Sequence, residues 1–130
     1  RAGIPYVGVS AGSNLACPTV KTTNDMPIVA PSGLDALGLI PIQINPHFFG
    51  GPIHYYDGDT LEKYAGETRE DRIREFHEMT TTPVLGMLEG TILRVEGDAY
   101  TLRGVGGARW FERGQPPRTL SIGQRLEGWS

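Results

Sequence analysis

A serine stands between two glycines directly after an apolar run, in the segment Gly8-Val9-Ser10-Ala11-Gly12. This pattern is typical of a nucleophile elbow, where a strand turns sharply into a helix and the serine takes a strained backbone conformation. The flanking glycines leave room for that close turn. We expect the Ser10 hydroxyl to attack an acyl group and the Ala11 backbone N–H to stabilise the resulting oxyanion. The alternative is a tight turn without chemistry.

A histidine and a glutamate follow two further apolar runs that predict strands. His47 comes just after residues 37–45, and Glu89 comes just after residues 84–88. Ligands bind at the carboxyl ends of the strands of open α/β sheets, so we expect both side chains to lie at one edge with Ser10. Histidine titrates near neutral pH and can take the serine proton, while a carboxylate orients the imidazole and stabilises its cation.

Each of these assignments has a competitor in the sequence. His47 could cap a turn, and Asp25 could replace Glu89 as the acidic member or shape the pocket. We favour Glu89 because it follows a predicted strand, whereas Asp25 lies in a loop. His54, in a predicted loop, and His77, on a charged helix, are interpreted as surface residues.

The predicted elements describe an α/β chain. Residues 4–9 read as a buried strand, residues 10–17 as a helix ended by a proline, residues 48–64 as a long exposed loop or lid, and residues 68–79 as a helix that begins with a capping box. Residues 91–95, 99–102 and 108–111 alternate as an antiparallel meander would, and residues 121–126 could add an edge strand.

Composition excludes several classes of protein. The 130 residues carry a net charge of −3, so no basic surface is available for nucleic acid. The sequence holds no apolar run long enough to cross a membrane. The single cysteine, Cys17, cannot form an internal disulfide, which is typical of a cytoplasmic protein. We expect no metal and no cofactor.

The apolar run at residues 4–9 also bears on whether this sequence is a whole domain. A strand that carries a nucleophile is usually central in a parallel sheet and needs neighbours on both sides for its backbone groups. We therefore expect strands upstream of this sequence, and we interpret residues 1–130 as the C-terminal part of a single α/β domain.

Several ordered blocks resemble the peptidase E family, the aspartyl dipeptidases. They are residues 8–19, Thr22-Thr23-Asn24-Asp25-Met26-Pro27-Ile28, Gln43-Ile44-Asn45-Pro46-His47-Phe48 and Gly66-Glu67-Thr68-Arg69-Glu70. The resemblance extends from the first residue to about Glu89-Gly90 and is weaker in the predicted meander.

This resemblance implies a fold and an activity. The fold would be an open, mostly parallel sheet with helices on both faces, related to the class I glutamine amidotransferase (flavodoxin-like) fold, followed by the antiparallel meander. The activity would be hydrolysis of dipeptides with an N-terminal aspartate, with Ser10 as nucleophile, His47 as base and Glu89 as acid. The family's Gly-Leu-Pro-Glu-Gly segment reads Gly86-Met87-Leu88-Glu89-Gly90 here, and residues 49–65 look longer than usual.

An aspartyl substrate requires a cation in the site. Arginine presents a planar fork of donors to a carboxylate, whereas lysine presents a mobile point charge. We therefore choose Arg69 for substrate binding, with Asp25 as a second residue that shapes the pocket. The competing interpretation of Arg69 is an exposed ion pair with Glu70 or Glu75.

Two other functions remain open at this point. A hydrolase of β-aspartyl-arginine polymer, similar to cyanophycinase, would keep the serine site, and a binding protein on the same scaffold would not use it. The expected partners are a small peptide substrate and the upstream half of the same protein, and a homodimer is left open as an assembly.

Overall fold

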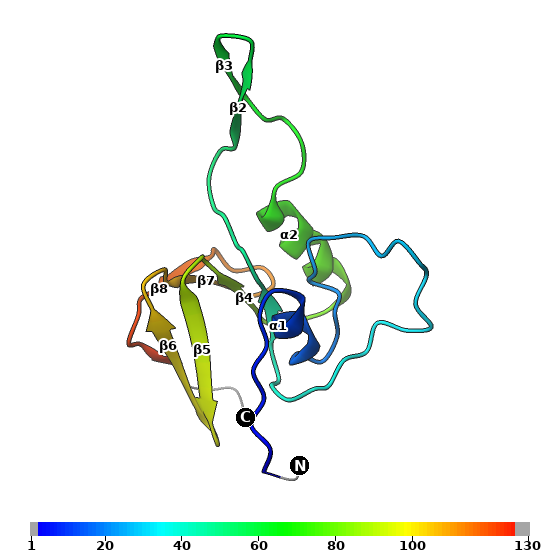
Figure 1. The fold of residues 1–130 in the computed structure, drawn as a ribbon, viewed down its shortest axis with the longest axis vertical. Helices are drawn as coiled ribbons and strands as arrows, with labels where there is room; N and C mark the ends of the chain where they lie inside the picture. The colour runs from blue at the N-terminus through cyan, green and yellow to red at the C-terminus, as the bar shows by residue number, and fades with distance from the viewer. Residues whose placement is uncertain (1–2, 127–130) are drawn as a thin grey trace.

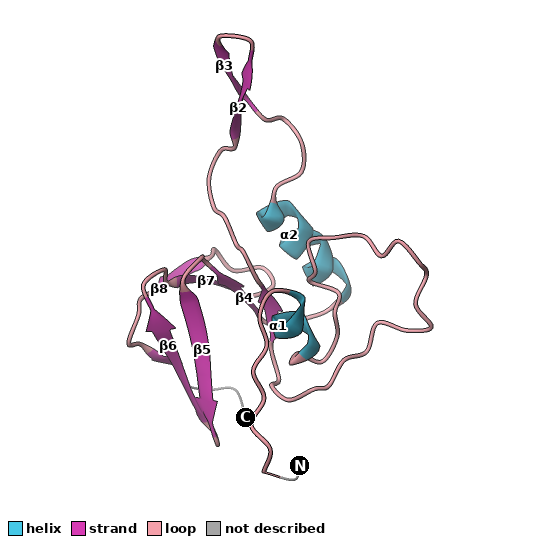
Figure 2. Cartoon of the chain, viewed as in Figure 1, coloured by secondary structure: helices cyan, strands magenta, loops and turns pink. Residues whose placement is uncertain are grey.

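The computed structural model describes residues 3–126 as a mixed α/β structure (Figures 1 and 2). Its elements, in chain order, are α1 (Ala11–Leu15), β1 (Gln43–Asn45), β2 (His54–Asp57), β3 (Thr60–Lys63), α2 (Arg69–Met79), β4 (Val84–Met87), β5 (Thr91–Glu96), β6 (Ala99–Gly104), β7 (Ala108–Phe111), β8 (Arg118–Leu120) and β9 (Arg125–Leu126). The α/β class expected from the sequence is confirmed.

The main sheet has the strand order β1-β4-β7-β8. Strands β1 and β4 are parallel, whereas β4 with β7 and β7 with β8 are antiparallel. The expectation of a mostly parallel sheet is therefore wrong for the described residues. The β1–β4 connection contains α2 and can return the chain in parallel, but β7 and β8 follow short connections that reverse its direction.

The two faces of the main sheet bury different partners. Val84 of β4 and Phe111 of β7 are register partners, and they pack with Ile73 of α2 on one face. Leu85 and Trp110, the next pair, face the opposite way and join a larger core with Leu102 of β6. The alternation of side chains along a strand explains the separation. Helix α2 thus covers one face, and the three-stranded sheet β5-β6-β9 covers part of the other.

The buried strand predicted at residues 4–9 is absent from the described chain. The structure assigns no strand there, and the side chains of Ile4, Val7 and Val9 are 82%, 88% and 78% exposed. A strand needs a hydrogen-bonded neighbour for its backbone groups. Among residues 3–126, no segment pairs with this one.

The predicted meander is also wrong as a single sheet. Strands β5 and β6 form an antiparallel hairpin, but β6 then pairs with β9, while β7 joins β4 and β8. Gly104 and Gly107, with φ of +97° and +88°, turn the chain between β6 and β7. Ala108, Trp110 and Phe111 are buried once β7 lies beside β4, which favours this pairing over the hairpin neighbour.

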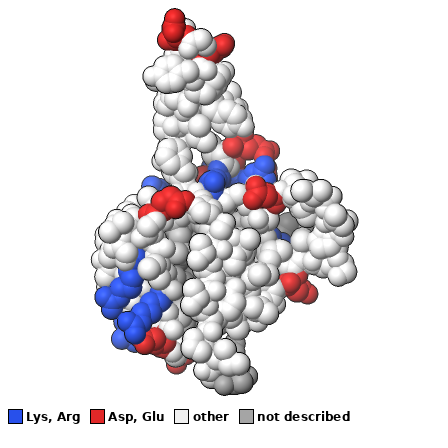
Figure 3. All heavy atoms as spheres, in the orientation of Figure 1, with Lys and Arg blue, Asp and Glu red and all other residues white. Residues whose placement is uncertain are grey.

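The expected exposed loop at residues 48–64 holds a small hairpin. Strands β2 and β3 pair from His54–Lys63 to Asp57–Thr60, and every residue of both strands is exposed. Figure 1 shows this hairpin extending away from the rest of the chain, and Figure 3 shows acidic side chains at its tip.

The predicted start of the second helix is confirmed. The Thr68 hydroxyl accepts a hydrogen bond from the Asp71 backbone N–H, and the Asp71 carboxylate accepts one from the Thr68 backbone N–H. This capping box fixes Arg69 as the first residue of α2. His77, expected at the surface, is instead buried, and its ring N–H donates to the Thr82 carbonyl oxygen.

Candidate active site

Ser10 has the strained backbone that its sequence pattern predicts. Its φ is +55°, and within the described chain only Ser10 and His47 combine a side chain with a positive φ. A Cβ atom on Gly8 would lie 2.3 Å from the Gly12 carbonyl oxygen, so the turn requires glycine at position 8. A Cβ on Gly12 would meet only the Tyr6 hydroxyl, at 3.9 Å. The close approach of the chain at residue 8 to the Gly12 carbonyl group therefore depends on Gly8 and not on Gly12.

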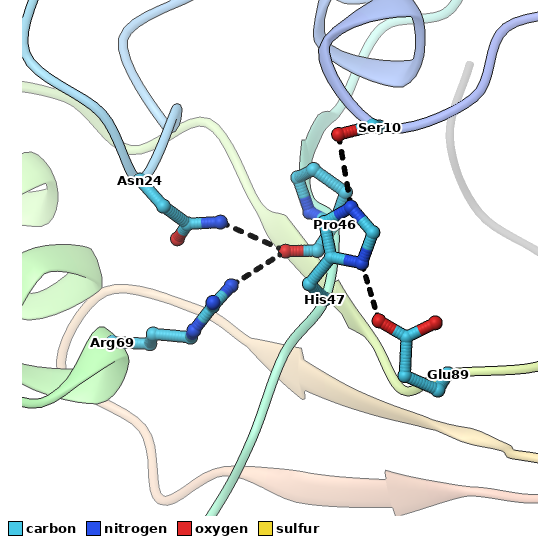
Figure 4. A network of polar contacts seen from close by, with 6 residues as sticks. All are labelled: Ser10, Asn24, Pro46, His47, Arg69 and Glu89. Carbon is cyan, nitrogen blue, oxygen red and sulfur yellow. Dashed lines mark hydrogen bonds and ion pairs between the residues drawn. The ribbon is translucent and has the colours of Figure 1, made fainter.

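Ser10, His47 and Glu89 form a continuous chain of hydrogen bonds (Figure 4). The Ser10 Oγ lies 2.9 Å from the His47 Nε2, and the Nδ1 of the same ring contacts the Glu89 Oε1. A carboxylate only accepts hydrogen bonds, so Nδ1 carries a proton and Nε2 is left to accept the Ser10 hydroxyl proton. All three residues are exposed in the described chain.

Two adjacent parallel strands place the histidine and the glutamate together. Asn45, the last residue of β1, is the register partner of Gly86 in β4. His47 and Glu89 follow these two positions by two and three residues, so they leave the sheet at the same edge. The Phe48 backbone N–H donates to the Met87 carbonyl oxygen and extends the pairing past His47.

Side chains from α1 and the loop after it bind the outer edge of β1. The Ile44 backbone N–H donates to the Cys17 Sγ, and the Ile44 carbonyl oxygen accepts from the Asn14 Nδ2 and the Thr22 hydroxyl. These contacts fix the helix that follows Ser10 against the strand that leads to His47. Burial raises the pKa of the Cys17 thiol to about 11, against a smaller opposing effect of the Ile44 N–H.

The carbonyl oxygen of Pro46 accepts two side-chain hydrogen bonds. The Asn24 Nδ2 lies 2.9 Å away and the Arg69 Nη1 lies 2.8 Å away (Figure 4). Both donors come from segments distant in sequence, and both meet the residue immediately before His47. The sequence carries no direct sign of the Asn24 contact; its only signal is that Asn24 lies next to Asp25 in a block that resembles the peptidase E family.

The other predicted site residues are placed as follows. Arg69 is half-buried and, within residues 3–126, has no ion pair with Glu70 or Glu75. Asp25 is exposed, and the described carboxylate that contacts His47 is that of Glu89. The Ala11 N–H belongs to the first turn of α1.

The described residues contain no group of three or more His, Cys, Asp or Glu side chains arranged to hold a metal ion. None of the helices in residues 3–126 has the length and apolar character needed to cross a membrane.

This arrangement can move a proton from a hydroxyl to an imidazole and stabilise the cation that forms. Such a relay activates a serine as a nucleophile. The exposure of all three groups leaves the Ser10 oxygen accessible to a small substrate.

The family model and the related proteins that match this chain all point to one kind of protein, a peptidase. The sequence model of Peptidase family S51 matches residues 1–103. A protein named peptidase E from Streptomyces coelicolor is 52% identical over 126 residues, which covers 97% of this chain and 49% of the relative. Relatives of the same name from Citrobacter koseri and Salmonella arizonae are 45% and 44% identical, each with 97% of this chain and 52% of the relative covered. The chain therefore spans about half the length of these relatives.

Proposed function

This chain belongs to Peptidase family S51, and from that premise we propose that it carries the nucleophile, base and acid of a serine dipeptidase that acts on Asp-Xaa substrates. The observation that carries the proposal is the hydrogen-bond chain from Ser10 through His47 to Glu89. The relatives named peptidase E support the assignment to the same activity.

The reaction would proceed by acyl transfer in two steps. The Ser10 oxygen attacks the carbonyl carbon of the Asp-Xaa peptide bond while the His47 Nε2 takes its proton. His47 then gives that proton to the departing amine of Xaa as the C–N bond breaks. Water, deprotonated by His47, next attacks the aspartyl ester, and the Ser10 oxygen leaves and recovers a proton. Glu89 stabilises the imidazolium that forms in each step.

The developing oxyanion requires hydrogen-bond donors. We assign one to the Ala11 backbone N–H, which follows the nucleophile at the start of α1. The resemblance to peptidase E implies a second donor from a glycine-rich loop upstream of this sequence. Loss of one such donor typically lowers kcat by about 100- to 1000-fold.

Recognition of aspartate is assigned to Arg69. One of its donors binds the Pro46 carbonyl oxygen, and no described carboxylate neutralises the guanidinium. The remaining donors are available for the substrate side chain. We keep Asp25, next to Asn24 in the same loop, as a substrate-binding residue that shapes the pocket.

The assembly and the location of the protein are part of the proposal. The apolar and exposed residues 4–9 support an upstream half that would pair with them, within a single flavodoxin-like peptidase domain. A second copy of the protein is the other candidate partner. The buried thiol of Cys17 supports the cytoplasm as the compartment.

Covalent labelling tests the function. The natural full-length protein should form an adduct with a serine-directed fluorophosphonate at Ser10, release aspartate from Asp-Leu, and leave β-aspartyl-arginine polymer intact. The variant Ser10→Ala should lose both the adduct and the hydrolysis. Polymer cleavage would point to the cyanophycinase-like activity, and a folded protein without an adduct would point to a binding protein.

A further inference from the structure

The peptide group that precedes His47, a residue with a strained backbone, is held by hydrogen bonds to the Pro46 carbonyl oxygen. The peptide plane between Pro46 and His47 includes the Pro46 carbonyl oxygen, so the position of that oxygen restricts the rotation at the His47 φ of +54°. A residue other than glycine keeps a positive φ only where its surroundings hold it there. Two donors on a single oxygen, from Asn24 and Arg69, provide such a restraint.

The orientation of the Asn24 amide is itself determined. Its Oδ1 accepts a hydrogen bond from the Asn45 Nδ2 at 2.7 Å, and the same Nδ2 donates to the Thr22 carbonyl oxygen at 3.0 Å. Asn45 is 2% exposed at the end of β1. With the Asn24 oxygen occupied as an acceptor, its NH₂ group points to the Pro46 oxygen, which can only accept.

The charge of the two donors separates their roles. Arg69 is cationic and is assigned above to the substrate carboxylate, so its loss would affect both recognition and the backbone of His47. Asn24 is neutral and half-buried, and in the described chain its side chain bonds to the Asn45 amide and to the Pro46 carbonyl oxygen. A change at Asn24 therefore acts on the histidine without removing the cation that binds aspartate.

We propose that Asn24 is a positioning residue of the site: through the Pro46 carbonyl oxygen it holds His47 in the left-handed conformation that aligns its imidazole with Ser10 and Glu89. The inference rests on the proposed function and deepens it. The loop at residues 22–25 would then position the general base, His47, in addition to shaping the substrate pocket through Asp25.

The test compares variants of the natural full-length protein. Asn24→Asp has the shape of the native side chain and still accepts from Asn45, but it replaces the donor to Pro46 with an acceptor. Asn24→Ala removes both contacts without adding a charge near His47. Lys21→Ala, an exposed residue of the same loop, is the control.

Two readouts separate positioning from recognition. An uncharged fluorophosphonate reports on Ser10 and His47 without the aspartyl carboxylate, and steady-state kinetics with Asp-Leu separate kcat from KM. Misplacement of a reacting group by about 1 Å costs on the order of 100-fold. We expect both Asn24 variants to lower the labelling rate and kcat by about 10- to 100-fold, with KM within about 2-fold of the wild type.

Other outcomes would overturn the proposal in distinct ways. Wild-type labelling rates in both Asn24 variants would remove Asn24 from the support of His47 while the peptidase assignment stands. A loss that disappears when rates are corrected for the folded fraction, measured by circular dichroism, would make Asn24 a stability residue only. Absence of labelling in the wild-type protein would instead refute the proposed function.

Discussion

At the scale of single residues, Ser10 and His47, the two non-glycine residues with a positive φ among residues 3–126, are hydrogen-bonded to each other. Ser10 and His47 both have a positive φ, and the Ser10 Oγ lies 2.9 Å from the His47 Nε2. Strain at a non-glycine residue costs on the order of 1–3 kcal/mol, so its presence at both partners indicates that the surrounding contacts hold this geometry. For Ser10 these include the close approach of Gly8, and for His47 the contacts at Pro46.

Arg69 provides a prediction at this scale. We expect Arg69→Ala to cost about 2–5 kcal/mol in kcat/KM for Asp-Leu, because the substrate carboxylate would be left unpaired in the site. Since Arg69 also binds the Pro46 oxygen, the variant should slow fluorophosphonate labelling as well. Arg72→Ala, on the same helix but paired with Glu67, is the matched control and should keep wild-type kinetics. Unchanged kcat/KM in Arg69→Ala would exclude this residue from the site.

Cys17 gives a pH prediction. Its thiol has a pKa of about 11 in the folded chain, against 9.0 for the unperturbed group, so the folded state binds its proton more tightly than the unfolded state. The associated stability is complete below about pH 9 and is lost as the pH rises through 11, a loss of about 2–3 kcal/mol.

Urea unfolding of the wild type and of Cys17→Ala at pH 8 and at pH 11 checks this. Other groups titrate in the same range, so the measured quantity is the difference between the two proteins. The wild type should lose more stability than the variant. Equal losses of unfolding free energy in the two proteins would show that ionisation of the Cys17 thiol does not affect the stability of the fold.

At the scale of elements, the site depends on one pair of parallel strands and one short helix. The β1–β4 pair brings His47 and Glu89 to the same edge. Helix α1 and the turn after it are bound to β1 through Asn14 and Cys17, and Ser10 lies at the N-terminal end of the helix. The antiparallel strands β7 and β8 extend the sheet on the far side of β4, where they contribute to the core and not to these contacts.

Substitutions of Gly8 and Gly12, on either side of Ser10, test the geometry of the turn. Gly8→Ala would place a Cβ 2.3 Å from the Gly12 carbonyl oxygen, so the backbone must shift and Ser10 must move relative to His47. We expect fluorophosphonate labelling of Gly8→Ala to fall by about 100-fold. Gly12→Ala has only a 3.9 Å contact with the Tyr6 hydroxyl and should label at a rate close to the wild type. Equal effects of the two substitutions would contradict the observed geometry of the turn.

At the scale of the whole molecule, several apolar side chains just before Ser10 are exposed to solvent. Ile4, Val7 and Val9 lead directly into Ser10 and are more than three-quarters exposed. Exposed apolar side chains that gather in one patch are typical of an interaction site. The curated relatives are about twice as long as this chain, which supports covering of residues 4–9 by the upstream half proposed above.

This proposal predicts a difference between two forms of the protein. The isolated 130-residue chain should react with fluorophosphonate at least about 100-fold more slowly than the natural full-length protein, because one oxyanion donor would be absent. Refolding of the chain together with a separately produced upstream half should restore labelling. A labelling rate for the isolated chain equal to that of the full-length protein would rule out a contribution of the upstream half.

Local patterns in the sequence were sufficient for much of this description. The elbow at Ser10, the capping box at Thr68 and the strand before Glu89 follow from rules that act within a few residues, namely the room left by glycine, the pairing of a hydroxyl with free backbone N–H groups, and an apolar run between turns. The other features depend on contacts between distant parts of the folded chain. The pairing of β7 with β4 instead of β6, the exposure of residues 4–9 and the meeting of Asn24 and Arg69 at Pro46 join segments far apart in sequence, and their geometry depends on which surfaces are buried together.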